Sequence, residues 1–158
     1  MDNRKWWNQL DDHWQNVFKE AIGIKLKPTD SDLEKIVNLQ KVAFSGDWDN
    51  KGTIANLEPL RALTNLQELD CSDNQLSDLE PLRALTNLRE LDCCSNQLSD
   101  LKPLRALTNL QKLDCRYNQI SDLEPLRALT NLQELNFGFN QISNLEPLRA
   151  ITNLPRLD

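Results

Sequence analysis

The residues best able to do chemistry in this sequence are its cysteines, and their spacing argues against a shared site. Cys71, Cys93 and Cys115 recur every 22 residues, and Cys94 directly follows Cys93. A zinc ion needs four ligands within ~2.3 Å, but adjacent residues of a strand point to opposite faces. We therefore predict that the three periodic thiols pack in the core as small hydrophobic groups, and that Cys94 alone faces outward.

Catalysis is not expected from the other residue types. His13 is the only histidine, which leaves no second imidazole for a metal, and the chain has only four glycines. It contains no Gly-x-Ser-x-Gly motif and no glycine-rich phosphate loop. Carboxylates on an open surface keep pKa values unsuited to acid–base catalysis. We therefore expect a protein that is not an enzyme and has no cofactor.

Composition narrows the class of protein further. The chain has 158 residues, 39% of them hydrophobic and 27% charged, which is typical of one soluble globular domain. A net charge of −6 without a basic face disfavours nucleic acid as a partner. No apolar run approaches the roughly 18 residues of a membrane span, and no signal peptide is visible. These features predict a cytoplasmic protein with reduced thiols and no membrane contact.

An internal repeat of 22 residues predicts the architecture. Full copies occupy residues 59–80, 81–102, 103–124 and 125–146. A degenerate copy with a five-residue insertion after Phe44 occupies residues 38–58, and a partial copy occupies 147–158. Each copy should contain a short strand, a turn with a buried asparagine such as Asn74, and a short helical or 3₁₀ segment near its proline. We expect stacked asparagine side chains to bond backbone groups and one another.

The segment LQELDCSDNQL (66–76) resembles the leucine-rich repeat motif. The 22-residue unit is most similar to those of bacterial internalins and of phosphatase-regulating repeat proteins. The resemblance covers residues 38–158 and implies an α/β solenoid shaped as an arc. In such a fold a parallel sheet of short strands forms the concave face, and short helical or 3₁₀ segments form the convex face.

Residues 1–37 should form an α-helical cap over the first repeat, so that the whole chain is a single structural domain. Residues of one helical face supply the apolar surface of this cap: Trp7, Leu10, Trp14, Val17, Phe18 and Ala21. A second helix begins near 29–31, with Ser31 and Glu34 spaced as a capping box. An open stack of repeats exposes its first apolar layer, which a cap of this kind would cover.

The outward-pointing positions of the strands and turns form the predicted binding face. Its candidate residues are Glu68, Asp70, Asp73, Arg89, Glu90, Asp92, Cys94, Lys112, Asp114, Arg116, Tyr117, Glu134, Asn136 and Phe139. Ser72 is expected to face outward with them. Strands ~4.8 Å apart place three of these carboxylates, Asp70, Asp92 and Asp114, in one column of like charge. We expect water and three nearby bases, Arg89, Lys112 and Arg116, to relieve the repulsion in that column.

The leading hypothesis is a protein-interaction module with an unidentified partner lying across the concave face. Tyr117, Phe139 and Arg116 have the composition of an interface hot spot, and Trp48 in the insertion could add a contact. Two alternatives stay open. The chain could self-associate through an uncapped C-terminal edge at 154–158, or the aspartate column or the 46–52 loop could bind a cation. On the convex face, recurring Glu and Arg residues three apart should form solvated ion pairs.

Overall fold

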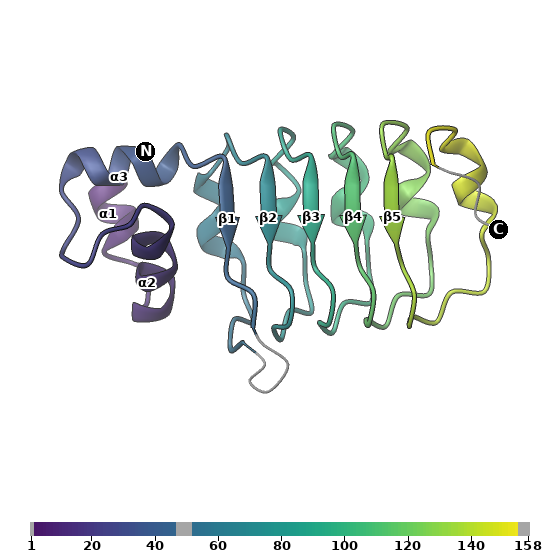
Figure 1. Ribbon diagram of the computed structural model, residues 1–158, viewed down its shortest axis with the longest axis horizontal. Helices are drawn as coiled ribbons and strands as arrows, with labels where there is room; N and C mark the ends of the chain where they lie inside the picture. Colours follow the sequence, from purple (N-terminus) through teal and green to yellow (C-terminus); the bar gives the residue numbers. More distant parts are fainter. Residues whose placement is uncertain (1, 47–51, 155–158) are drawn as a thin grey trace.

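Five parallel strands form one sheet in the computed structural model, which describes residues 2–46 and 52–154 (Figure 1). The strands follow chain order and are β1 (Lys41–Ala43), β2 (Glu68–Asp70), β3 (Glu90–Asp92), β4 (Lys112–Asp114) and β5 (Glu134–Asn136). Equivalent residues of successive repeats are in register, so that Leu69 pairs with Leu91 and Leu91 pairs with Leu113. The predicted leucine-rich repeat solenoid is therefore confirmed.

Five 3₁₀ segments lie behind the sheet in Figure 1 and form the opposite side of the stack. They are η1 (Glu58–Ala62), η2 (Glu80–Leu82), η3 (Lys102–Ala106), η4 (Glu124–Ala128) and η5 (Glu146–Ala150). Each starts with a proline in its first turn, where the missing N–H costs nothing. The side chain two residues before each segment accepts its first N–H, as Asp78 does from Glu80 at 2.7 Å. An oxygen of this kind caps the start of all five segments.

The core lies between the sheet and the 3₁₀ segments, and the repeated leucines fill it. Strand alternation turns Leu69 and Cys71 inward while Asp70 between them stays half-buried. Cys71, Cys93 and Cys115 are each fully buried, and Phe137 takes the same place in the last full repeat. The predicted cysteine packing is confirmed: these three thiols replace apolar side chains in one layer of the core.

Asparagines after β2, β3, β4 and β5, three of them buried and Asn140 half-buried, bind successive repeats together. The Asn96 amide nitrogen is within hydrogen-bond distance of the carbonyls of Cys93, Cys94 and, in the preceding repeat, Cys71. Its carbonyl oxygen accepts the N–H of Leu76, also in the preceding repeat, at 2.9 Å. The same bonds recur at the equivalent positions, Asn74, Asn118 and Asn140. We call these four residues the asparagine ladder. The expectation that these amides would bond one another is wrong, because backbone groups occupy both ends of each amide.

A second row of asparagines, which the sequence analysis did not identify, lies on the exposed side of the repeats. Asn87 donates to the carbonyl of Thr64 in the preceding repeat at 2.9 Å. The equivalent residues Asn109, Asn131 and Asn153 make the same contact with the threonine of the repeat before. Each residue of this row contributes one exposed bond between repeats.

Three helices, α1 (Asn3–Trp7), α2 (Asp12–Ala21) and α3 (Asp30–Val37), lie at the β1 end of the stack, left in Figure 1. The predicted stripe from Trp7 to Ala21 is divided between α1 and α2, because Asp11 caps a new helix by accepting the N–H of Trp14. Ala21 is exposed.

The predicted capping box at Ser31 and Glu34 is also wrong. The box is formed by Thr29 and Asp32, two residues earlier in the chain, and α3 therefore begins at Asp30. The two reciprocal bonds satisfy backbone N–H groups that would otherwise be free at the helix start.

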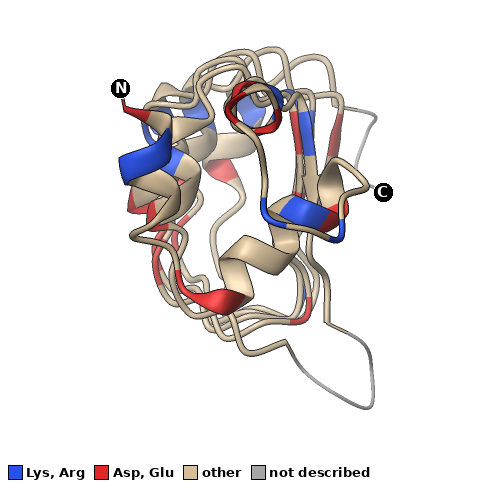
Figure 2. Ribbon diagram, turned by 90° about the vertical axis from the view of Figure 1, so that its left-hand side faces the viewer, with Lys and Arg blue, Asp and Glu red and all other residues tan. Residues whose placement is uncertain are grey.

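Aromatic rings join these helices to the first repeat. The Trp14 ring meets Phe44 edge-on with centroids 5.0 Å apart, and Phe18 lies between Trp14 and Trp6 at 5.5 and 5.4 Å. Viewed onto this end in Figure 2, the helices lie across the end of the stack, and acidic and basic positions are interspersed along their ribbons. The apolar layer that β1 would expose is thereby largely covered.

Ion pairs between residues three apart line the 3₁₀ segments, as expected. Arg61, Arg83, Arg127 and Arg149 pair with Glu58, Glu80, Glu124 and Glu146. All of these side chains are largely solvated, and Lys102 replaces the glutamate before Arg105. The convex face therefore presents balanced charge.

We predict that Asn96→Ala lowers the free energy of unfolding by about 3 kcal/mol, because it leaves buried backbone groups of two repeats without partners. Asn87→Ala removes a single exposed bond and should cost no more than about 1 kcal/mol. Urea denaturation followed by circular dichroism measures both. Equal losses in the two variants would show that the asparagine ladder is no more important than the exposed row.

Candidate binding face

The outward strand residues form rows across the sheet that are partly neutralised by cross-strand ion pairs. Lys41 contacts Glu68 at 2.7 Å, and Lys112 contacts Glu90 at 3.1 Å. Glu68 and Glu90 lie opposite each other in the register of β2 and β3, so their like charges repel. The lysine on the other side of each glutamate compensates its charge. Over residues 2–46 and 52–154, Glu134 and Arg89 have no partner within ion-pair distance and remain available.

The aspartate column is present, but its repulsion is relieved differently from the prediction. Asp70, Asp92 and Asp114 each accept the backbone N–H two residues later, at 3.0–3.1 Å. Of the three bases expected to help, only Arg116 does so, through contacts of 2.6–3.0 Å to both oxygens of Asp114. Lys112 is held by Glu90 instead. The two aspartates without a cationic partner are therefore Asp70 and Asp92.

The side chain two residues after each aspartate completes its surroundings. On the outer face, Ser72 is buried, and its hydroxyl donates to Asp70 at 2.6 Å. Cys94 stands in the same place beside Asp92 and is half-buried, on the face opposite Cys93, as predicted. Burial and the neighbouring Asp92 charge raise the pKa of the Cys94 thiol to about 12, so it stays protonated at neutral pH. Cys94 is thus a hydrogen-bonding neighbour of Asp92 and not a reactive thiolate.

A cation at this column would meet competition from the protein itself. Ligand atoms of Asp92, Cys94 and Asp114 lie within 4.8 Å of one another. However, Asp92 already accepts the Cys94 N–H, and Arg116 contacts both oxygens of Asp114. A metal ion would have to displace Arg116 and deprotonate a thiol whose pKa is raised. Binding of a cation therefore stays a prediction that these contacts do not favour.

Tyr117 and Phe139 form a stacked pair on the turns that follow β4 and β5. Their ring centroids are 4.2 Å apart and their planes differ by 7°. Tyr117 is 44% exposed and Phe139 is 72% exposed, so the pair presents a flat apolar surface to the solvent. Tyr117 and Phe139 hold the same place in successive 22-residue repeats, and the structure brings their rings into contact.

Both rings stand at positions where the backbone disfavours them. Tyr117 and Phe139 have φ of +54° and +58°, and the equivalent Asp73 and Ser95 have φ of +52° and +55°. Short polar residues tolerate this left-handed region, whereas a bulky residue there costs about 1–2 kcal/mol. Strain of this kind concentrates at functional sites. This strain could not be predicted from residue spacing, because it arises from the turn around the asparagine that follows each position.

A shallow groove of about 220 Å³ crosses the sheet beside these residues. The aspartate column and Asn136 on β5 line this groove. It is also lined by the row of outward strand residues, Lys41, Glu68, Glu90, Lys112 and Glu134. Asn136 continues the column without a charge. The groove therefore presents its acidic groups mainly over β2 and β3.

Several predicted contacts fall outside the described residues. Trp48 and the acidic part of the 46–52 loop lie in residues 47–51, and most of the predicted C-terminal edge lies in residues 155–158. His13 is exposed, as expected, and its Nδ1 is 3.1 Å from the hydroxyl of Thr53. Among the described helices, none has both the length and the apolar character needed to cross a bilayer.

Comparison with known proteins agrees with this geometry. The sequence profile of a family described as "Leucine Rich repeats (2 copies)" matches residues 37–84, 64–106 and 108–150. The chain belongs to the leucine-rich repeat proteins. No curated protein matches it significantly.

Similar solved structures are bacterial leucine-rich repeat proteins. An internalin (inlF) from Listeria monocytogenes has 30% identity and a TM-score of 0.80, covering 94% of this chain and 43% of its own. Internalin C2 from the same species has 31% identity and a TM-score of 0.66, covering 91% of this chain and 71% of its own. A leucine-rich repeat protein from Leptospira interrogans has 28% identity and a TM-score of 0.69, covering 91% and 39%. The chain thus spans less than half the length of the first and third of these proteins.

We predict that Asp92→Asn stabilises the fold at pH 7. Burial, followed by the charges of Asp114 and Asp70, raises the pKa of Asp92. A carboxyl whose pKa is raised on folding loses its proton first in the unfolded chain, so it opposes folding once the pH exceeds the unfolded pKa. Asparagine keeps an oxygen that can accept the Cys94 N–H, and an asparagine, Asn136, stands at the equivalent position of the last full repeat.

Thermal melts at pH 7 and pH 3 measure this effect. The midpoint of Asp92→Asn should exceed that of the unchanged chain at pH 7, and the gain should vanish at pH 3, where the aspartate is protonated. Asp114→Asn serves as the control, because it breaks the pair with Arg116 and should give no gain at pH 7. The same gain at both pH values would contradict an electrostatic origin.

Proposed function

We propose that the chain is a non-enzymatic protein-interaction module that binds its partner across the sheet, on the face made of the aspartate column and the Tyr117–Phe139 pair. Leucine-rich repeat proteins generally act as binding modules. The observation that carries the proposal is the exposed aromatic stack, whose two rings occupy strained left-handed positions. A fold selected for stability alone would place asparagine, aspartate or glycine at these positions.

The charges beside the stack indicate the chemistry of the partner. Because Arg116 is held by Asp114, it is less available to a partner than the sequence suggested. Asp70 on β2 and Asp92 on β3 lack such a base and lie on the strands that precede the β4 and β5 repeats of the stack. A partner surface that joins an apolar or aromatic side chain with lysine or arginine would complement both parts of this face.

Three further predictions lie outside this proposal. Self-association through the C-terminal edge, ion-dependent binding and a cytoplasmic location stay predictions. Light scattering over a concentration range, calcium calorimetry and cell fractionation, respectively, are the measurements that address them.

The proposal predicts that replacing both rings, Tyr117→Asn with Phe139→Asn, reduces capture of the partner by at least about tenfold. The melting temperature should not fall, because releasing the backbone strain at two positions, about 1–2 kcal/mol each, at least offsets the loss of one ring contact of about 1 kcal/mol. Immobilised protein exposed to lysate of the source organism, with quantitative mass spectrometry, provides the measurement.

Arg127→Gln, on the convex face of the same part of the stack, is the matched control and should capture the same proteins as the unchanged chain. The proposal fails if the double variant remains folded and still captures those proteins at undiminished level. It also fails if the convex variant loses them to the same extent.

A further inference from the structure

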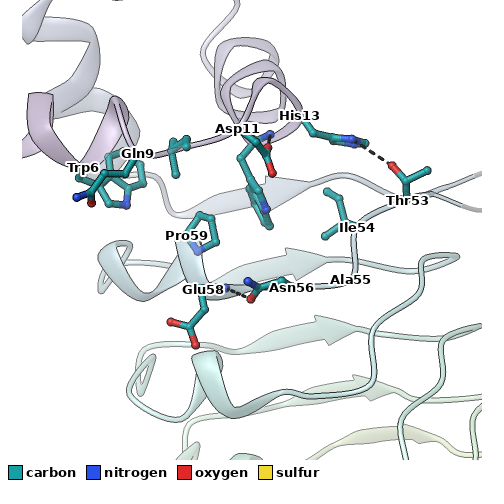
Figure 3. Close-up of a pocket in the computed structure, with 12 residues that line it drawn as sticks. Trp6, Gln9, Asp11, His13, Thr53, Ile54, Ala55, Asn56, Glu58 and Pro59 are labelled. Carbon is teal, nitrogen blue, oxygen red and sulfur yellow. Dashed lines mark hydrogen bonds between the residues drawn. The ribbon is translucent and has the colours of Figure 1, made fainter.

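The junction between the helices and the first repeat contains a cleft of about 540 Å³, which is within the size range of small-molecule sites (Figure 3). The helical cap contributes residues between Trp6 on α1 and Trp14 on α2. The first repeat contributes residues 53–56, 58 and 59. The cleft is separate from the sheet face described above and plays no part in the proposed protein interaction.

The cleft exists because the helices cover the first repeat less completely than one repeat covers the next. The prolines of the later 3₁₀ segments, Pro81, Pro103, Pro125 and Pro147, are all buried. Pro59 holds the same place in η1 but is only half-buried, and it lies on the floor of the cleft. Trp6 and Leu10 on the opposite wall are also half-buried. Apolar surface on both walls is therefore left for a ligand to cover.

The walls are aromatic, and their charge is negative. The half-buried side chains of Trp6, Leu10 and Pro59 give the cleft most of its open apolar surface, and the nearly buried Trp14 and Ile54 lie beneath them in its lining. Over the described part of the chain, no lysine or arginine lines it, and its acids are Asp11 and Glu58. Glu58 is engaged by Arg61, whereas Asp11 uses one oxygen for the Trp14 N–H and keeps the other free for a ligand.

Indole faces together with a carboxylate favour organic cations, because the electron-rich ring face and the charge both attract them. We propose that this cleft binds a small organic cation with an apolar body, whose ring lies between the Trp6 indole and Pro59, close to Trp14, and whose ammonium group contacts Asp11. A contact of 3.1 Å between His13 Nδ1 and the Thr53 hydroxyl joins the two walls of the cleft (Figure 3).

The test is a titration with 2-phenylethylammonium, followed by the indole N–H signals of the tryptophans in NMR spectra. The signals of Trp6 and Trp14 should shift, with a dissociation constant on the order of 1 mM for a ligand of this size. Phenylacetate and 2-phenylethanol carry the same ring with negative or no charge. They should bind at least about fivefold more weakly, because they lack the cationic group.

Asp11→Asn should weaken the ammonium compound about fivefold without unfolding α2, because asparagine is an equally good helix cap. Asp12→Asn, which removes the adjacent charge outside the cleft, should leave its affinity unchanged. Equal or tighter binding of the neutral or anionic compound, an unaffected Asp11→Asn, or no shift of the two indole signals at about 10 mM ligand would overturn the proposal. The outcome of this titration does not affect the capture experiment, which tests binding at the sheet face.

Discussion

The asparagine ladder is the constraint on which the rest of the structure depends. Each amide joins the turn of its own repeat to the repeat before it, by donating to carbonyls on both sides and accepting one N–H. These are buried polar groups, so their loss costs more than the loss of a surface bond. Because the ladder allows one geometry of the turn, every repeat enters and leaves its strand at the same place. The strict 22-residue period follows from this requirement.

The same turn determines what the sheet face can present. The residue immediately before each ladder asparagine adopts a left-handed backbone, as Tyr117 does before Asn118. In the first three full repeats, the residue four positions before the asparagine is the aspartate whose oxygen accepts a turn N–H. Positions of both kinds face the solvent while their backbone is fixed. The protein can therefore change the chemistry of its binding face from repeat to repeat without changing the scaffold.

Much of the fold could be predicted from the sequence because it depends on periodicity alone. The repeat predicts the parallel strands, and alternation within Leu69–Cys71 predicts which thiols are buried. The neighbouring positions of Tyr117 and Phe139 follow from the same period. Each of these inferences needs only the spacing of residues and the geometry of a strand.

Other features depend on contacts that spacing does not encode. The positive φ of Tyr117 arises from the turn around Asn118, and the burial of Ser72 arises from its bond to Asp70. Arg116 could reach several acids, and only side-chain geometry selects Asp114. The cleft beside Pro59 results from imperfect packing between two unlike elements, for which no periodic rule exists. Sequence therefore predicted the scaffold better than the details of its surface.

Hydrogen exchange of single amides tests the central role of the asparagine ladder most directly. The N–H groups of Leu76, Leu98 and Ile120 donate to the side chains of the ladder and to nothing else that the structure shows. They should exchange as slowly as the strand-end amides of Cys71, Cys93 and Cys115, which donate to backbone carbonyls of the next repeat. If they exchange as fast as an exposed loop amide such as that of Lys25, the asparagine ladder does not hold the repeats together.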